Sequence, residues 1–145
     1  MKRIFFTLTL LLIVMTASAQ DTLSVSSSSF KKWSKDLSNS GYPLTQSSND
    51  GKHEFWAKFM LNMESAFVVK ITPLTSFEKL ISNLDQPERF IYNGLNAAYG
   101  LSSSKSYLII EVPENKVVVS IFTEHTLKKG QMEEIASSVP YKKIK

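Results

Sequence analysis

The sequence predicts a single α+β domain, residues 30–139, in which an antiparallel sheet of about four strands, two hairpins, packs with about four helices. The expected order is α-β-β-α-α-β-β-α. Apolar residues recur at helical spacing in some segments, and β-branched runs flank turn residues in others. The chain has no cysteine but contains nine Phe, five Tyr and two Trp in its full length, so large aromatic residues must stabilise the core without disulfides.

Residues 1–19 have the three parts of a secretion signal. Two basic residues follow the first methionine, a mostly apolar run covers 4–15, and Ala-Ser-Ala at 17–19 provides the small residues that signal peptidase requires. The apolar run is about a dozen residues, whereas a membrane span needs roughly 20. We therefore predict cleavage between Ala19 and Gln20, with an uncleaved N-terminal anchor as the alternative. Without a lipobox cysteine, we expect a periplasmic or secreted protein that has no stable membrane anchor after cleavage.

Charge and cysteine content exclude several classes of function. Removal of the signal takes two of the 17 basic residues, which leaves 15 against 13 acidic residues and a net charge of +2. Three of those 15 lie in a basic C-terminal tail, residues 140–145, so the chain lacks the concentrated basic face of a nucleic-acid-binding protein. The lack of cysteine excludes thiol nucleophiles and thiolate metal sites. We expect no nucleic-acid partner and no cofactor.

A flexible serine-rich leader over residues 20–29 precedes the first predicted helix. In that helix Phe30, Trp33 and Leu37 recur at i, i+3 and i+7, which is the spacing of one buried helix face. Gly41 then stands in the position of a C-cap.

Residues 43–52 carry a proline and an Asn-Asp-Gly sequence, which predicts a loop. Residues 53–61 fit either a strand or a helix. We favour a strand, because a turn at 62–65 then leads directly into a second strand at 66–72.

Two helices are expected next. The clearest helical pattern of the chain has four apolar residues at i, i+3, i+4 and i+7: Phe77, Leu80, Ile81 and Leu84. Thr75 and Glu78 have the spacing of a capping box at its start. Pro87 ends this helix and begins another. The second helix has an apolar face of four residues and a glycine cap: Ile91, Leu95, Ala98, Tyr99 and Gly100.

The C-terminal part of the domain contains the second hairpin and the last helix. Two β-branched runs, 107–112 and 117–122, are joined around a Pro-Glu-Asn turn. Both faces of these runs are largely apolar, so we place this hairpin in the middle of the sheet, covered on both sides. A helix over about 127–138 follows.

Two histidines, each beside a glutamate, support an alternative hypothesis of a small secreted hydrolase or metal-dependent enzyme. If the hairpins pair in one sheet, His53 and His125 converge with a carboxylate in a minimal zinc or hydrolase site. Adjacent residues of a strand point to opposite faces, so His53 and Glu54 cannot both face one ion. The chain also has no H-E-x-x-H, G-x-S-x-G or phosphate-binding glycine motif.

Aromatic side chains with a polar tip suit contacts with carbohydrate, peptide or protein. Trp56 shares a strand face with Glu54 and Lys58, which makes it the best candidate for an exposed binding residue, and Tyr42 is the second candidate. The leading hypothesis is an exported, non-enzymatic binding module for a protein or an envelope component. A sugar-binding domain is a third hypothesis, and it requires aromatic residues exposed on one face.

Overall fold

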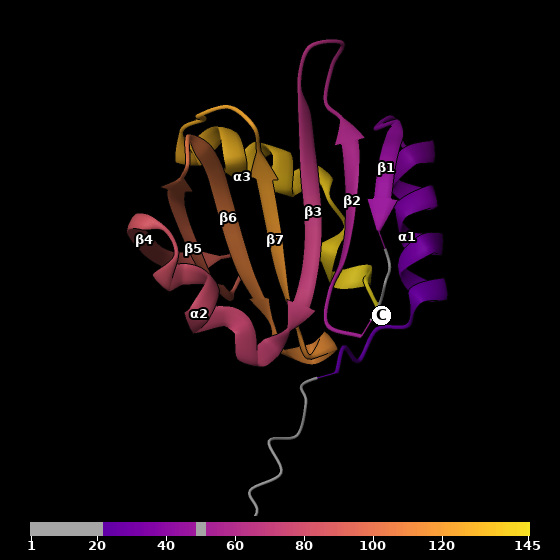
Figure 1. The fold of residues 1–145 in the computed structure, drawn as a ribbon, viewed down its shortest axis with the longest axis horizontal. Coiled ribbons are helices and arrows are strands. Elements are labelled where there is room, and N and C mark those ends of the chain that lie inside the picture. The colour runs from indigo at the N-terminus through magenta and orange to yellow at the C-terminus, as the bar shows by residue number, and fades with distance from the viewer. Residues whose placement is uncertain (1–21, 49–51) are drawn as a thin grey trace, which may run out of the picture.

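A computed structural model describes residues 22–48 and 52–145 of the chain. Within these ranges a single antiparallel sheet of seven strands has the order β1-β2-β3-β7-β6-β5-β4, with helices on both faces (Figure 1). The elements in chain order are α1 (Ser27–Asn39), β1 (Leu44–Ser48), β2 (Phe55–Met60), β3 (Ala66–Pro73), α2 (Phe77–Ser82), β4 (Asp85–Tyr92), β5 (Leu95–Ser102), β6 (Lys105–Val112), β7 (Val117–Thr123) and α3 (Lys129–Ser138). The predicted α+β class is confirmed.

The predicted numbers of strands and helices are wrong, because the described residues form seven strands and three α-helices instead of about four of each. The largest error concerns residues 85–102, where the helix predicted from Pro87 is replaced by the β4–β5 hairpin. Its turn is Asn93-Gly94, with φ values of 49° and 79°, as a two-residue hairpin turn requires. Pro87 is accommodated because β4 is an edge strand, where an N–H is not needed on the open side.

The N-terminal strands differ from the prediction in one element and agree in another. Residues 43–52 are predicted as a loop, but they contain β1, a polar and exposed strand at the second edge of the sheet. The ambiguous segment 53–61 contains β2, so the preference for a strand is confirmed. The β6–β7 hairpin is also confirmed, and β7 is the central strand of the sheet.

The main core lies between α1, α3 and the face of the sheet that we call the first face. Its largest fully buried side chains include four phenylalanines: Phe30, Phe55, Phe59 and Phe67. Burial of each such ring contributes roughly 1.5–3 kcal/mol to the free energy of folding. Tyr99 donates a hydrogen bond of 2.6 Å to the Leu127 carbonyl, and Tyr92 donates one of 3.0 Å to the Glu133 carbonyl. These two bonds tie β5 and β4 to the chain around α3.

Among the α-helices that the structure describes, α2 is the one that lies on the second face of the sheet (Figure 1). This helix has six residues and is therefore shorter than the predicted one. It packs into a smaller core with residues of β5, β6 and β7: Phe77, Ile81, Leu84, Ala98, Ile109 and Val118. Within the described residues no helix lies over the second face of β2 and β3.

Both ends of the described chain pack against the domain. Val25, which belongs to the predicted leader 20–29, is buried in the first-face core, and α1 already begins at Ser27. In the predicted tail 140–145, Tyr141 and Ile144 are buried while the lysines are exposed. The predicted cleavage site at Ala19 and Gln20 lies outside the described residues.

Close contact between Gly100 on β5 and Leu84, which follows the C-terminal end of α2, generates a prediction about stability. A Cβ atom at position 100 would lie 2.9 Å from the Cβ of Leu84, which has no freedom to rotate away. We expect Gly100→Ala to lower the free energy of unfolding by about 1–3 kcal/mol, the usual cost of overpacking. Thermal or urea unfolding followed by circular dichroism measures this change.

Gly130 on α3 provides the matched control, because no atom lies within 4 Å of a Cβ built there. Gly130→Ala should leave stability unchanged or raise it by up to about 1 kcal/mol. Equal effects of the two substitutions would contradict the close packing of Leu84 against Gly100.

Candidate binding site on the open sheet face

The part of the second face that α2 leaves uncovered is the candidate site, and we call it the open strip. Strand register places its side chains in two rows, with Trp56, Lys70 and Ser120 in one row. The neighbouring row contains four residues on β2, β3, β7 and β6: Lys58, Val68, Phe122 and Tyr107. The site therefore combines aromatic, cationic and hydroxyl groups from strands that are distant in the sequence.

Three depressions in this surface adjoin one another, because Lys70 lines all of them. One of about 430 Å³ lies between Thr72 and Lys79 of α2. A second of about 220 Å³ lies over Ser120 and Tyr107, and a third of about 300 Å³ lies beside Trp56. We call the three together the second-face groove. Its size is within the range of small-ligand sites.

Two ion pairs flank Trp56. Lys70 Nζ lies 2.5 Å from Glu54 Oε2, and Lys58 Nζ lies 3.0 Å from Glu124 Oε1. The Lys58 ammonium donates a hydrogen bond to Glu124 and so holds the pKa of that carboxyl below its usual value. The groove beside Trp56 is therefore highly polar but locally balanced in charge.

Three half-buried aromatic side chains lie on this face. Tyr107 and Phe122 stack with their ring centroids 5.0 Å apart, and Trp56 lies on β2 across β3 from Phe122. Burial raises the pKa of the Tyr107 phenol above its usual value of 10. The phenol therefore stays protonated near neutral pH and can donate a hydrogen bond.

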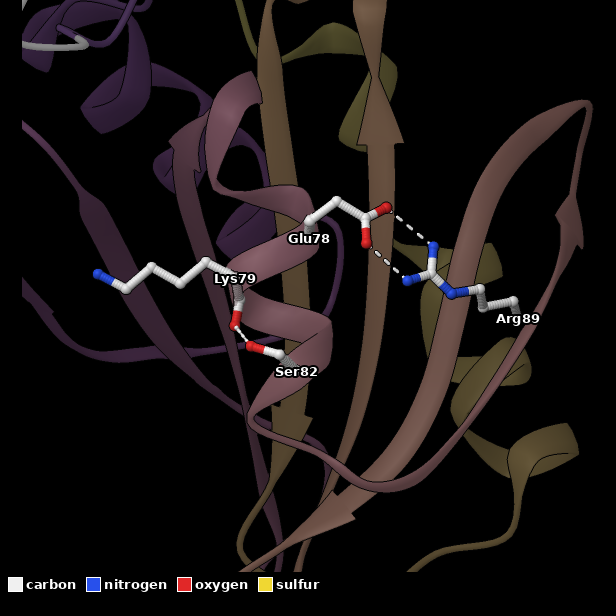
Figure 2. Close-up of polar contacts among 4 residues, drawn as sticks. All are labelled: Glu78, Lys79, Ser82 and Arg89. Atoms are coloured by element: carbon white, nitrogen blue, oxygen red, sulfur yellow. Dashed lines mark hydrogen bonds and ion pairs between the residues drawn. The ribbon is translucent and has the colours of Figure 1, made fainter.

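The wall of the groove is α2, which a bidentate ion pair ties to β4 (Figure 2). Arg89 donates from Nη1 to Glu78 Oε1 at 2.9 Å and from Nη2 to Glu78 Oε2 at 2.6 Å. Figure 2 shows the Lys79 side chain extending from the opposite side of the helix. Lys79 lines the groove there and belongs to none of the ion pairs found among the described residues.

Two residues that line the groove, Ser120 and Thr72, have hydroxyl oxygens that are almost completely covered by other protein atoms. Ser120 is 3% exposed and Thr72 is 6% exposed, and neither hydroxyl has a hydrogen-bond partner within the described residues. A buried hydroxyl without a partner costs about 1–3 kcal/mol. The other three buried polar residues, Ser34, Ser106 and Thr123, belong to the first-face side, and each donates a hydrogen bond to a backbone carbonyl.

The structure separates the two residues predicted to bind a ligand. Trp56 lies in the second-face groove, which Glu54 and Lys58 also line. Tyr42 lies at one end of the sheet, where its ring packs edge-on against Phe67 of the first-face core. It lines a different cavity of about 390 Å³ between the β2–β3 hairpin and α3. The two side chains therefore do not form one surface.

The two histidines are separated as well. His53 lines the groove before β2, whereas His125 lines the cavity that contains Tyr42, beyond the end of β7. The register of β2, β3 and β7 puts them eight residue positions apart along the strands, or roughly 26 Å at about 3.3 Å per residue. Zinc–nitrogen bonds are about 2 Å long, so one ion cannot bind both imidazoles. The described residues also contain no group of three His, Cys, Asp or Glu side chains suited to a metal.

Several residues of the groove are not found by reasoning from the sequence alone. Lys70, Thr72 and Ser120 each interrupt an otherwise apolar strand, and this interruption is the signal that they carry. Their convergence depends on the pairing of β3 with β7, which no local pattern predicts. The position of Lys79 beside the groove depends in addition on where α2 packs on the sheet.

The fold and the site define a small α+β domain whose single antiparallel sheet is closed on one face and half open on the other. None of the described helices has the length and hydrophobicity of a membrane span. Comparison with known proteins matched no family model, no curated protein and no solved structure.

The Glu78–Arg89 pair predicts a pH-dependent contribution to stability. The bound guanidinium holds the pKa of Glu78 below its usual value near 4.5. The pair therefore stabilises the fold above that usual value, and its contribution is lost as the pH falls through the lower pKa of the folded state. We expect Glu78→Gln to lower the melting temperature at neutral pH and to have a smaller effect in acid.

Melting temperatures of wild type and variant at about pH 7 and pH 3, in low salt, test this expectation. Glu134→Gln is the control, because Glu134 is exposed on α3 and makes no ion pair within the described residues. A Glu78→Gln effect that stays the same at both pH values would show that the ion pair does not hold α2.

Proposed function

We propose that this chain is an exported, non-enzymatic binding module that recognises a protein or an envelope component through the open strip. The observation that carries the proposal is the second-face groove, where the half-buried rings of Trp56, Tyr107 and Phe122 lie beside the ion-paired Lys58 and Lys70. Aromatic side chains with polar neighbours are the residues on which binding energy most often concentrates.

The open strip also has the properties of a preformed site. Its strands are fixed by the sheet ladder, and their opposite side chains are anchored in the first-face core. A ligand that binds a rigid surface loses less conformational entropy in the complex than one that must order it. The ion pairs at Lys58 and Lys70 hold polar groups in defined positions around Trp56.

Export is the second part of the proposal. It rests on the basic, apolar and small-residue pattern of residues 1–19. Because an exported protein is in the envelope or outside the cell, its expected partner is an envelope component or a secreted protein.

A binding experiment with Trp56→Ala tests the role of the open strip. The exported protein with a C-terminal affinity tag captures its partner from the envelope fraction of its source, and the partner is quantified by mass spectrometry. We expect Trp56→Ala to reduce capture roughly tenfold, because loss of a central aromatic contact costs more than 1 kcal/mol.

Ile91→Ala is the matched control. Ile91 is 66% exposed and lies on β4, at the far edge of the second face from Trp56. Its capture should equal that of wild type, and both variants should keep the circular dichroism spectrum of the fold. Undiminished capture by Trp56→Ala would refute the open strip as the binding surface.

Export has its own test. The mass of the protein recovered from the periplasm or medium should correspond to a chain that begins at Gln20. Ala19→Arg should block cleavage, because signal peptidase requires a small residue at that position, whereas Ser18→Ala should be processed normally. Recovery of an uncleaved wild-type chain would contradict the proposed signal.

A further inference from the structure

Lysines gather at the end of the sheet where the first and last described residues lie beside the β6–β7 turn (Figure 1). The Leu23 N–H donates to the Lys52 carbonyl at 3.2 Å, and the Ser24 hydroxyl donates to the Asn115 carbonyl at 2.6 Å. The Asn115 side-chain amide in turn donates to the Lys142 carbonyl at 2.9 Å. These bonds bring together four segments that are distant in the sequence. We call this surface the basic end, and its exposed lysines are Lys52, Lys116, Lys142, Lys143 and Lys145.

Acidic side chains do not balance the charge of the basic end. Its five lysines belong to none of the ion pairs found among the described residues. Glu54 lies nearby, at the start of β2, but it is paired with Lys70. The remaining acidic residues in or next to these segments are fewer than the lysines: Asp21, Asp50 and Glu114. The helix α1 begins at the same end and adds two more exposed lysines near its start: Lys31 and Lys32.

We propose that the basic end binds the surface of a membrane that contains anionic phospholipids. Each lysine close to such a surface strengthens binding roughly fivefold. This attraction acts over about 10 Å at about 0.1 M salt. The large apolar residues that are clearly exposed among the described ones lie elsewhere, so the contact is electrostatic and reversible. Three of them, Leu44, Leu61 and Met63, lie at the opposite end of the sheet, and Ile91 lies on the β4 edge.

The place where the chain enters the domain favours a membrane over a dissolved polyanion. Residue 22, the first that the structure describes, lies at the basic end. Only residues 16–21 separate it from the apolar run 4–15, and six residues span at most roughly 20 Å. In the proposed export the apolar run enters the membrane. The basic end is then the part of the domain that meets the lipid headgroups.

Binding through the basic end leaves the open strip accessible. The strands run from the basic end toward the opposite end of the sheet, so the second face lies along the side of the domain (Figure 1). The inference therefore adds a second surface and does not depend on the open strip. It rests on the proposed export only for the choice of a membrane as the partner.

Sedimentation of the exported protein with lipid vesicles tests the inference. We expect binding to phosphatidylcholine vesicles that contain about 30% phosphatidylglycerol, at about 0.05 M salt. Vesicles of phosphatidylcholine alone should bind at least about tenfold more weakly. Salt at about 1 M should release the protein, because it shortens the Debye length to about 3 Å. Equal binding to both vesicles that resists salt would instead show attachment through an apolar segment.

Two double variants test whether lysines from different segments form one surface. The first combines Lys142→Gln with Lys143→Gln near the C-terminus, and the second combines Lys52→Gln with Lys116→Gln on the β2 and β7 side. Each pair should weaken binding to the anionic vesicles about tenfold or more. Both should keep the circular dichroism spectrum, because all four side chains are exposed. Weakening by the first pair alone would show that a basic tail acts by itself, and would contradict the basic end as one surface.

The matched control removes the same charge from the opposite end of the sheet. Lys105 begins β6, whose other end leads into the β6–β7 turn, and Lys128 precedes α3. Lys105→Gln combined with Lys128→Gln should change binding by less than about threefold, because these lysines lie beyond the Debye length from the bound surface. Equal weakening by the control pair would show that net charge alone drives binding, and would overturn the inference.

The outcomes separate this inference from the proposed function. Lack of binding to the anionic vesicles at low salt makes the inference wrong, and so does binding of dissolved heparin without binding of vesicles. Trp56→Ala should leave vesicle binding unchanged, and the basic-end variants should keep Trp56-dependent capture from the envelope fraction. Loss of vesicle binding therefore refutes the membrane surface alone, whereas loss of that capture refutes the open strip alone.

Discussion

A continuous row of aromatic rings on the first face is the interaction on which the rest of the fold depends. The rings run from Phe30 and Trp33 on α1 through Phe55 and Phe59 on β2 to Phe67 on β3. The chain has no cysteine, so no disulfide shares this stabilising role. Because the core of these strands lies on one face, their side chains on the other face are available for different chemistry.

The width of the sheet explains why the second face stays partly open. Seven strands spaced about 4.8 Å apart span roughly 29 Å, whereas one helix with its side chains is about 10–12 Å across. Of the α-helices in residues 22–48 and 52–145, α1 and α3 cover the first face and α2 lies on the second. The Glu78–Arg89 pair and the contact of Leu84, just after α2, with Gly100 hold α2 over β5 and β6. The uncovered part therefore runs from β2 and β3 to Phe122 of β7 and Tyr107 of β6.

The strength of local patterns decides how much of the fold is predictable. The strands β6 and β7 are predicted correctly because short β-branched runs on both sides of a turn indicate a hairpin and do not have helical spacing. The β4–β5 hairpin is mistaken for a helix because Ile91 and Leu95 have helical spacing and Pro87 resembles a helix start. Asn93-Gly94 is the stronger signal, since few other sequences adopt positive φ at two successive positions without strain. The polar strand β1 has no local signal, because its pairing with β2 alone defines it.

The candidate site follows the same division between local and long-range information. Alternation along β2 is enough to assign Trp56 to the face opposite Phe55 and Phe59. Lys70 and Ser120 become neighbours only through the pairing of β3 with β7, and Tyr42 is drawn into the first-face core by Phe67. A serine or threonine inside an apolar strand can nevertheless be recognised from the sequence. Such a hydroxyl is expected to be buried, and buried hydroxyls usually have a hydrogen-bond partner. On the first face the fold supplies that partner, whereas on the second face the Ser120 hydroxyl has none within the described residues.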